Sequence, residues 1–110
     1  MSDSGKRVFE LTTTVTFPHL PLEHLDEFAR KLEDAVRTVL SDNPAVTAYF
    51  VTPDRGTGDF MLGFRFDGAD PRYIEEMAVD MLNEAVELVA AQDGSKPLRP
   101  EREESALVLA

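Results

Sequence analysis

The sequence predicts a small α+β domain, and two kinds of periodicity support this prediction. Within residues 59–66, large apolar side chains recur at every second position: Phe60, Leu62, Phe64 and Phe66. Side chains of a strand alternate between its two faces, so this stretch predicts a strand with one strongly apolar face. Two other stretches repeat apolar residues at helical spacing, and they are long enough to cover such a face.

Two further strands are expected N-terminal to this one. Residues 7–17 alternate apolar positions with polar ones and are rich in β-branched residues, which favours a half-buried strand. Its second face carries Thr12, Thr14 and Thr16. Residues 45–52 have strand composition but ambiguous facing: either Val46, Ala48 and Phe50 point inward, or Thr47, Tyr49 and Val51 do. We favour the first interpretation, which turns Tyr49 outward.

The two helices have recognisable starts and ends. Pro21 suits the first position of a helix that continues to about residue 40 and buries an apolar stripe: Leu25, Phe28, Ala29, Leu32, Ala35, Val36 and Val39. For the second helix, Asp70 is suited to the N-cap and Gly94 to the left-handed C-terminal position. Its expected apolar stripe is Ile74, Met77, Ala78, Met81, Leu82, Ala85, Leu88 and Val89.

The chain divides into three parts. Residues 1–6 are polar and are expected to form a flexible N-terminus. Residues 7–94 form a single α+β domain, and residues 95–110 a loop followed by a short C-terminal edge strand or tail. The last five residues, 106–110, are apolar and are expected to pair as an edge strand. This strand can pair either with its own sheet or with a neighbouring molecule, and the sequence leaves both alternatives open.

The order strand, helix, strand, strand, helix, strand, with right-handed crossovers, predicts a ferredoxin-like split βαβ fold. Both helices then cover one face of an antiparallel sheet, and the first and third strands are central. The uncovered face is where we expect function. Its candidate ligand or interface residues are Arg65, Tyr49, Met61, Thr12 and Thr14.

Composition excludes several classes of function. The net charge of -10 makes binding to nucleic acid or to an anionic membrane surface repulsive. The chain has no cysteine, which excludes disulfides, thiol catalysis and thiolate metal sites. No apolar run reaches the length of about 20 residues that a membrane span needs, so a cytoplasmic location is expected. The preference for arginine over lysine indicates a bacterial source.

No catalytic group, metal site or cofactor is predicted. His19 and His24 are five residues apart, a spacing that does not place two ligands on one helix face. Residues 54–58 contain two glycines but precede a strand, whereas a phosphate-binding loop precedes a helix. The carboxylate pairs lie on predicted solvated faces, where burial cannot raise their pKa for general acid–base work.

The stretch Gly58–Phe64 resembles the third strand of RNA-recognition modules. In those modules the stacking aromatic residues face away from the helices. Here Phe60 and Phe64 share a face with Leu62 and Phe66, so exposing them to RNA would remove the core. Two other groups with this fold are excluded as well: the chain lacks the Cys-x-x-Cys of metallochaperones and the glycine-rich anion loop of acylphosphatases.

The leading functional prediction is a non-enzymatic homodimeric module that self-associates or binds protein through the uncovered face. One alternative is a small-molecule binder, or a cofactor-free enzyme, in which Arg65 holds an anion. Another is an acidic inhibitor that presents one face of the second helix to a basic partner. The residues of that face are Glu76, Asp80, Glu84 and Glu87.

Overall fold

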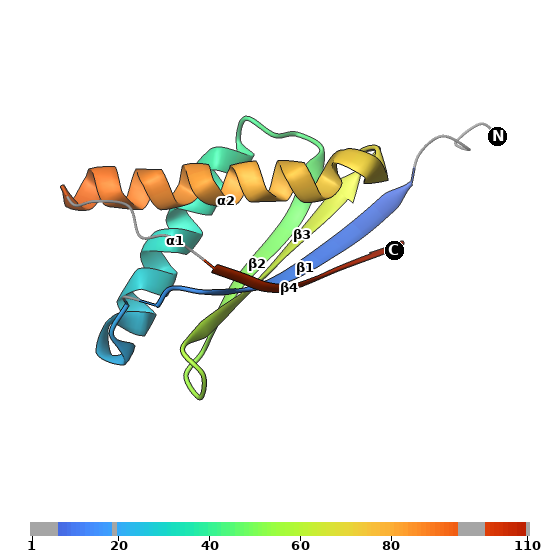
Figure 1. The fold of residues 1–110 in the computed structure, drawn as a ribbon. Helices are drawn as coiled ribbons and strands as arrows, with labels where there is room; N and C mark the ends of the chain where they lie inside the picture. The colour runs from blue at the N-terminus through green and yellow to red at the C-terminus, as the bar shows by residue number, and fades with distance from the viewer. Residues whose placement is uncertain (1–6, 19, 95–100, 110) are drawn as a thin grey trace.

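A computed structural model describes residues 7–18, 20–94 and 101–109 of the chain (Figure 1). The elements are β1 (Val8–Thr16), the short 3-10 helix η2 (Leu22–His24), α1 (Leu25–Leu40), β2 (Val46–Asp54), β3 (Asp59–Asp67), α2 (Pro71–Asp93) and β4 (Glu101–Leu109). The segments predicted as a flexible N-terminus and as most of the linker after Gly94, together with His19, lie outside the described residues.

The four strands form one antiparallel sheet in the order β2-β3-β1-β4. Both helices lie on the same side of this sheet, with α2 running across the strands (Figure 1). We call this side the helix face and the other side the open face. The arrangement confirms the predicted ferredoxin-like architecture, including the central positions of β1 and β3.

The core lies between the helix face and the two helices. The apolar stripe predicted for α1 is buried in full, and the four alternating residues of β3 are each at most 3% exposed. At one end, the rings of Phe17, Phe28 and Phe60 pack edge to face with centroids 4.9 to 5.7 Å apart. Such pairs stabilise a core beyond the area that they bury. In α2, Met77 and Leu88 are only partly buried, while Val86 and Ala90 complete the buried side.

The ends of the helices depart from expectation at one point. Asp70 caps α2 as predicted and accepts a hydrogen bond from the backbone N–H of Arg72, and Gly94 adopts the left-handed conformation after the helix. Pro21, however, does not start α1. Its backbone is extended, it precedes η2, and α1 begins only at Leu25.

The facing of β2 agrees with the favoured interpretation at Val46 and is the opposite of it from Ala48 onward. The register shifts between Val46 and Ala48, so that Val46 lies opposite Phe66 and Tyr49 lies opposite Phe64, all on the helix face. A bulge of this kind places two consecutive residues against one on the partner strand. It therefore reverses the alternation part-way along β2 and turns Ala48 and Phe50 to the open face.

The C-terminal strand is longer than predicted. β4 begins at Glu101, five residues before the apolar segment, and pairs antiparallel with β1 along its length. Ser105 donates a hydrogen bond of 2.9 Å to the hydroxyl of Thr13, which is buried on the helix face.

Within the described segments, no helix is both long and apolar enough to cross a membrane.

Candidate functional site: the open face of the sheet

The open face is a regular array of side chains from all four strands. The strand registers place Ala48, Arg65, Glu10 and Val108 in one row across the sheet. The next row contains Phe50, Gly63, Thr12 and Ala106, and the following one begins with Thr52, Met61 and Thr14. Because the helices lie on the other side, no described element covers this array (Figure 1).

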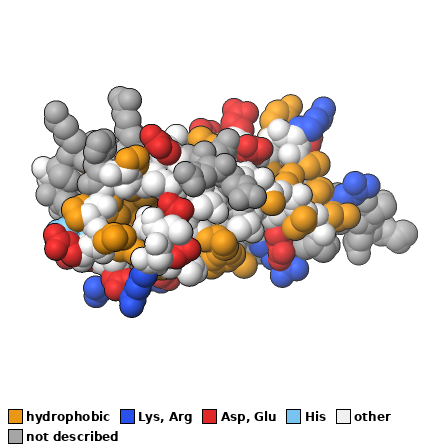
Figure 2. Space-filling view, turned by 60° about the horizontal axis from the view of Figure 1, so that its bottom comes forward, with side chains coloured by type: hydrophobic (Ala, Val, Ile, Leu, Met, Phe, Trp, Pro, Cys, Tyr) orange, Lys and Arg blue, Asp and Glu red, His pale blue; other side chains and the backbone are white. Residues whose placement is uncertain are grey.

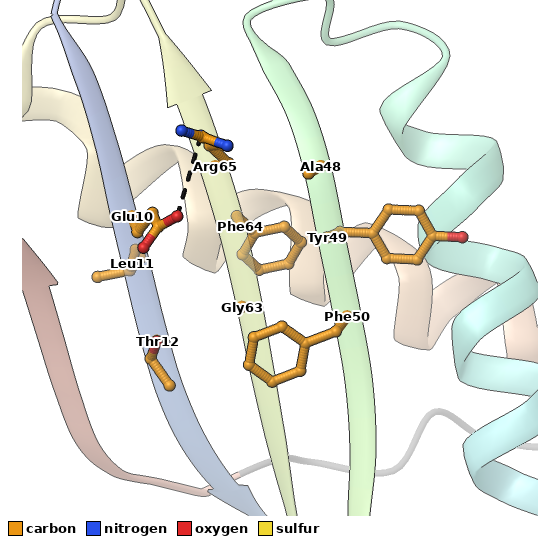
Figure 3. Close-up of a pocket in the computed structure, with 9 residues that line it drawn as sticks. All are labelled: Glu10, Leu11, Thr12, Ala48, Tyr49, Phe50, Gly63, Phe64 and Arg65. Carbon is orange, nitrogen blue, oxygen red and sulfur yellow. Dashed lines mark ion pairs between the residues drawn. The ribbon is translucent and has the colours of Figure 1, made fainter. Parts of the chain in front are cut away.

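The most prominent exposed aromatic side chain of this array is that of Phe50. Its ring lies flat across β3, directly over Gly63, with its outer side turned away from the sheet (Figure 3). A Cβ atom on residue 63 would lie 2.6 Å from both Cδ2 and Cζ of the ring, so the absence of a side chain at Gly63 is what permits this position. Phe50 nevertheless remains 43% exposed, and Met61 on the neighbouring row is 45% exposed.

A hollow of about 190 Å³ lies beside the Phe50 ring. The open-face side chains that line it are those of Glu10, Thr12, Ala48, Phe50 and Arg65, with Gly63 beneath the ring (Figure 3). The hollow exists because Ala48, Gly63 and Thr12 are small, whereas Phe50 and Arg65 rise on either side of them. Its walls therefore combine an aromatic surface, a hydroxyl group and a charged pair.

The charged pair is formed by Arg65 and Glu10, which lie opposite each other on β3 and β1. The distance from Arg65 Nε to Glu10 Oε2 is 3.9 Å, so the contact is an ion pair rather than a hydrogen bond (Figure 3). Both side chains are about half exposed. An exposed pair of this kind contributes little to stability, about 0–1 kcal/mol, because water screens both charges.

The structure brings four of the five candidate residues together. Thr12, Thr14, Met61 and Arg65 all lie on the open face. Tyr49 does not: its side chain points to the helix face (Figure 3), and its hydroxyl accepts a hydrogen bond of 3.1 Å from Arg37 Nε of α1. That bond is the main reason why the pKa of Arg37 is raised.

Phe50 is the open-face residue that the sequence analysis placed on the wrong side. The signal that could have identified it is Gly63, which leaves a gap on the open face of a central strand. Such a gap favours an aromatic side chain from the neighbouring strand that covers the exposed backbone. Using this signal requires knowing the register of β2, and the bulge after Val46 alters that register.

Titratable groups do not gather into a further site on the part of the chain that the structure describes. That part contains no group of three or more histidine, aspartate or glutamate side chains placed to hold a metal ion. His24 lies near two carboxylates: its Nε2 is 3.9 Å from Glu23 Oε1, and its Nδ1 is 3.9 Å from Glu27 Oε1. All three side chains are exposed. On the side of the molecule shown in Figure 2, hydrophobic side chains are instead exposed at several places between acidic ones.

Comparison with known proteins supports the fold and does not assign a family. No family model matches the chain, and no curated protein sequence matches it. Among solved structures, a dimeric ferredoxin-like protein from an uncultured marine organism is similar over 94% of each chain, with 9% identity and a TM-score of 0.57. An antibiotic biosynthesis monooxygenase is similar over 93% of this chain and 95% of that one, with 16% identity and a TM-score of 0.50. At such low identities, these likenesses show the ferredoxin-like fold alone.

Proposed function

We propose that the protein is a non-enzymatic homodimeric module that self-associates through the open face of its sheet. The observation that carries this proposal is the exposure of Phe50 and Met61 side by side on a regular surface that neither described helix covers. The chain as a whole is strongly acidic, with 21 acidic and 11 basic residues. Large apolar side chains that gather on one face of such a protein favour a protein contact there.

The size of the face fits this function. Each strand has nine residues. At about 3.3 Å per residue and about 4.8 Å between strands, the sheet spans roughly 30 by 19 Å. The accessible surface of such a corrugated face is larger than this projected area. It is therefore comparable with the roughly 800 Å² per partner that a stable interface buries.

The composition of the face also fits. The row of Arg65 and the row of Phe50 carry small residues, Thr12 and two large apolar side chains, Phe50 and Val108, and the charges on these two rows are those of Glu10 and Arg65, which form a pair. The third row adds Met61 and, opposite Thr14, the acidic residue Glu104. A two-fold axis that passes through the first two rows would bring the same groups of both copies together, with their charges already paired. The similarity in fold to a ferredoxin-like protein that is dimeric supports the proposal as well.

The test is the native mass of the full chain in solution, measured by light scattering coupled to size exclusion. We expect a dimer at micromolar concentrations. Because both subunits are acidic, added salt should screen their repulsion and strengthen the dimer. Phe50→Glu and Met61→Glu should each yield a folded monomer, because a carboxylate would lose its hydration in the interface.

Leu22→Glu is the matched control. Leu22 is also large, apolar and exposed, but it lies on η2, away from the open face. This variant should keep the dimer. A wild-type chain that is monomeric across this concentration range, or a dimer that survives both open-face substitutions, would overturn the proposal.

A second candidate function is favoured by the hollow beside Phe50. Within the described residues the guanidinium of Arg65 pairs with Glu10 at 3.9 Å and makes no hydrogen bond, so its N–H groups are available, and Glu10 offers acceptor oxygens next to them. Donors and acceptors side by side suit a group that carries both, such as an amide, better than a simple anion, which Glu10 would repel. The Phe50 ring offers a flat surface for stacking. A small planar molecule with an amide edge is the ligand class that fits.

Benzamide and benzoate are suitable probes for this candidate because they have the same shape and differ in charge. We expect benzamide to shift the NMR amide signals of Phe50, Gly63 and Arg65 saturably, and benzoate to bind more weakly. Arg65→Ala and Phe50→Leu should each abolish the saturable shifts. Binding of benzamide that is unchanged in Arg65→Ala would show that the hollow is not the site.

A further inference from the structure

The free edge of β4 is a second unusual surface, separate from the open face. β4 pairs with β1 along one edge, and no described strand lies on its other edge. The last three described residues of β4 are apolar and exposed, two of them on the helix face and one on the open face. Leu107 and Leu109 share the helix face with Leu11 and Phe9 but are 38% and 63% exposed, while Val108, on the open face, is 56% exposed.

Leu107 and Leu109 are exposed because the helices do not extend over the end of β4. Figure 1 shows β4 at the margin of the sheet, on the far side of β1 from β3 and β2. The described residues therefore leave space beside the edge and on its helix side. A surface dimer through the open face would cover Val108 and would leave these two leucines in water.

The two edges of the sheet differ in how they are protected. Natural sheets block edge-to-edge pairing with bulges, prolines and charged residues. The β2 edge has all three: the bulge after Val46, Pro53 and Asp54. In β4, the irregularity in pairing and all the charged residues lie in the first half, 101–104. The second half, Ser105–Leu109, has no charge, no proline and no bulge.

We propose that the segment Ser105–Leu109 pairs antiparallel with the same segment of a second copy, so that two sheets join into one. With the two-fold axis at Leu107, Leu107 lies opposite its own copy and Ser105 opposite Leu109, all on the helix face. Cross-strand apolar pairs of this kind stabilise a sheet, and the edge hydrogen bonds that water now satisfies are made between chains.

A second copy is the occupant that the charge pattern favours. In an antiparallel pair centred on Leu107, the acidic halves of the two β4 strands point away from each other. A parallel pair would instead place Glu101, Glu103 and Glu104 of both copies alongside one another, which like charges disfavour. This edge contact does not rest on the open-face dimer. Together the two contacts would give each subunit two neighbouring copies.

Cysteine crosslinking of the full chain tests the pairing, because the chain has no native cysteine. Opposing residues of an antiparallel pair have Cβ atoms about 4.5–5.5 Å apart, which is close to what a disulfide requires. In Leu107→Cys, the two opposing cysteines of the proposed pair should therefore be near enough to form a disulfide. Under mild oxidation we expect a covalent dimer to form at least tenfold faster than in the exposed control Leu22→Cys. A mixture of Ser105→Cys and Leu109→Cys chains should likewise crosslink to each other faster than either does to itself.

The same crosslinks separate this proposal from the open-face dimer. Residues 105, 107 and 109 lie on the helix face, where face-to-face packing cannot join them, so Leu107→Cys should crosslink equally fast when Met61→Glu is also present. A rate for Leu107→Cys no higher than that of Leu22→Cys, in a chain whose circular dichroism is unchanged, would overturn the edge pairing. So would faster self-crosslinking of Leu109→Cys than of Leu107→Cys, because it would contradict the register.

Discussion

The ring of Phe50 occupies the space that a side chain at Gly63 would need. The two residues lie opposite each other on β2 and β3, and a Cβ atom at position 63 would meet three atoms of the ring. The flat position of Phe50, the hollow beside it and its exposed outer side all depend on this glycine.

Gly63→Ala should therefore destabilise the protein by about 1 kcal/mol, because the ring must move from its place and this loss exceeds the gain from removing a flexible glycine. In a Phe50→Ala background the sign should reverse, and the same substitution should stabilise by roughly 0.5–1 kcal/mol. Urea unfolding of the four chains at matched concentration measures both effects. Equal effects in the two backgrounds would mean that the ring and the glycine are not coupled.

The sequence was sufficient for the fold because local patterns and tertiary packing agree there. The alternation in β3, the apolar stripe of α1 and the cap at Asp70 each reflect an interaction that the structure contains. The facing of β2 could not be predicted, because one extra residue at the bulge reverses the alternation and leaves no mark in composition. The exchange of Tyr49 for Phe50 on the open face is a direct consequence of that bulge.

Phe60→Ala should cost about 3–5 kcal/mol, since this ring is fully buried and packs against both Phe17 and Phe28. The loss should appear as a lower urea midpoint with an unchanged slope. Met61→Ala is the matched control, because it changes the next residue of the same strand on the opposite face. At concentrations where the chain is monomeric, its effect should stay within about 0.5 kcal/mol.

The cap of α2 should make stability depend on pH in the acidic range. Hydrogen bonds from the side chain and then the backbone of Arg72 lower the pKa of Asp70. A carboxylate whose pKa is lower in the folded state stabilises the fold above its unfolded pKa, and this contribution is lost as pH falls through the folded value. Wild type should therefore exceed Asp70→Asn in unfolding midpoint near neutral pH.

This difference should begin to shrink as pH falls below about 4, the ordinary pKa of an aspartate in an unfolded chain, and should disappear once pH has fallen below the lowered pKa of Asp70 in the folded state. Asparagine is an effective cap but cannot form the ion pair with Arg72, so the comparison isolates the charge. Asp26→Asn is a useful control, because Asp26 is also exposed and paired with an arginine, Arg55, but caps no helix. If the unfolding midpoints of wild type and Asp70→Asn differ by the same amount near neutral pH and well below pH 4, the charge of Asp70 does not contribute to stability.

The pair of Glu10 and Arg65 can report whether the open face is covered in solution. In an isolated subunit both side chains are about half exposed, so a double-mutant cycle with Glu10→Gln and Arg65→Gln should show a coupling of only about 0–1 kcal/mol. If a second copy covers the face, the same pair loses water and breaking it becomes more costly, by about 3–5 kcal/mol for a fully buried pair.

The cycle should therefore be measured twice, below and above the concentration at which the chain dimerises, with unfolding followed at each. We expect the coupling to rise with protein concentration and to become less sensitive to salt, because a covered pair is screened less than an exposed one. A coupling that stays small and salt-sensitive at both concentrations would place Glu10 and Arg65 outside any interface. The dimer contact would then have to lie elsewhere on the subunit, with the hollow beside Phe50 left open to small molecules.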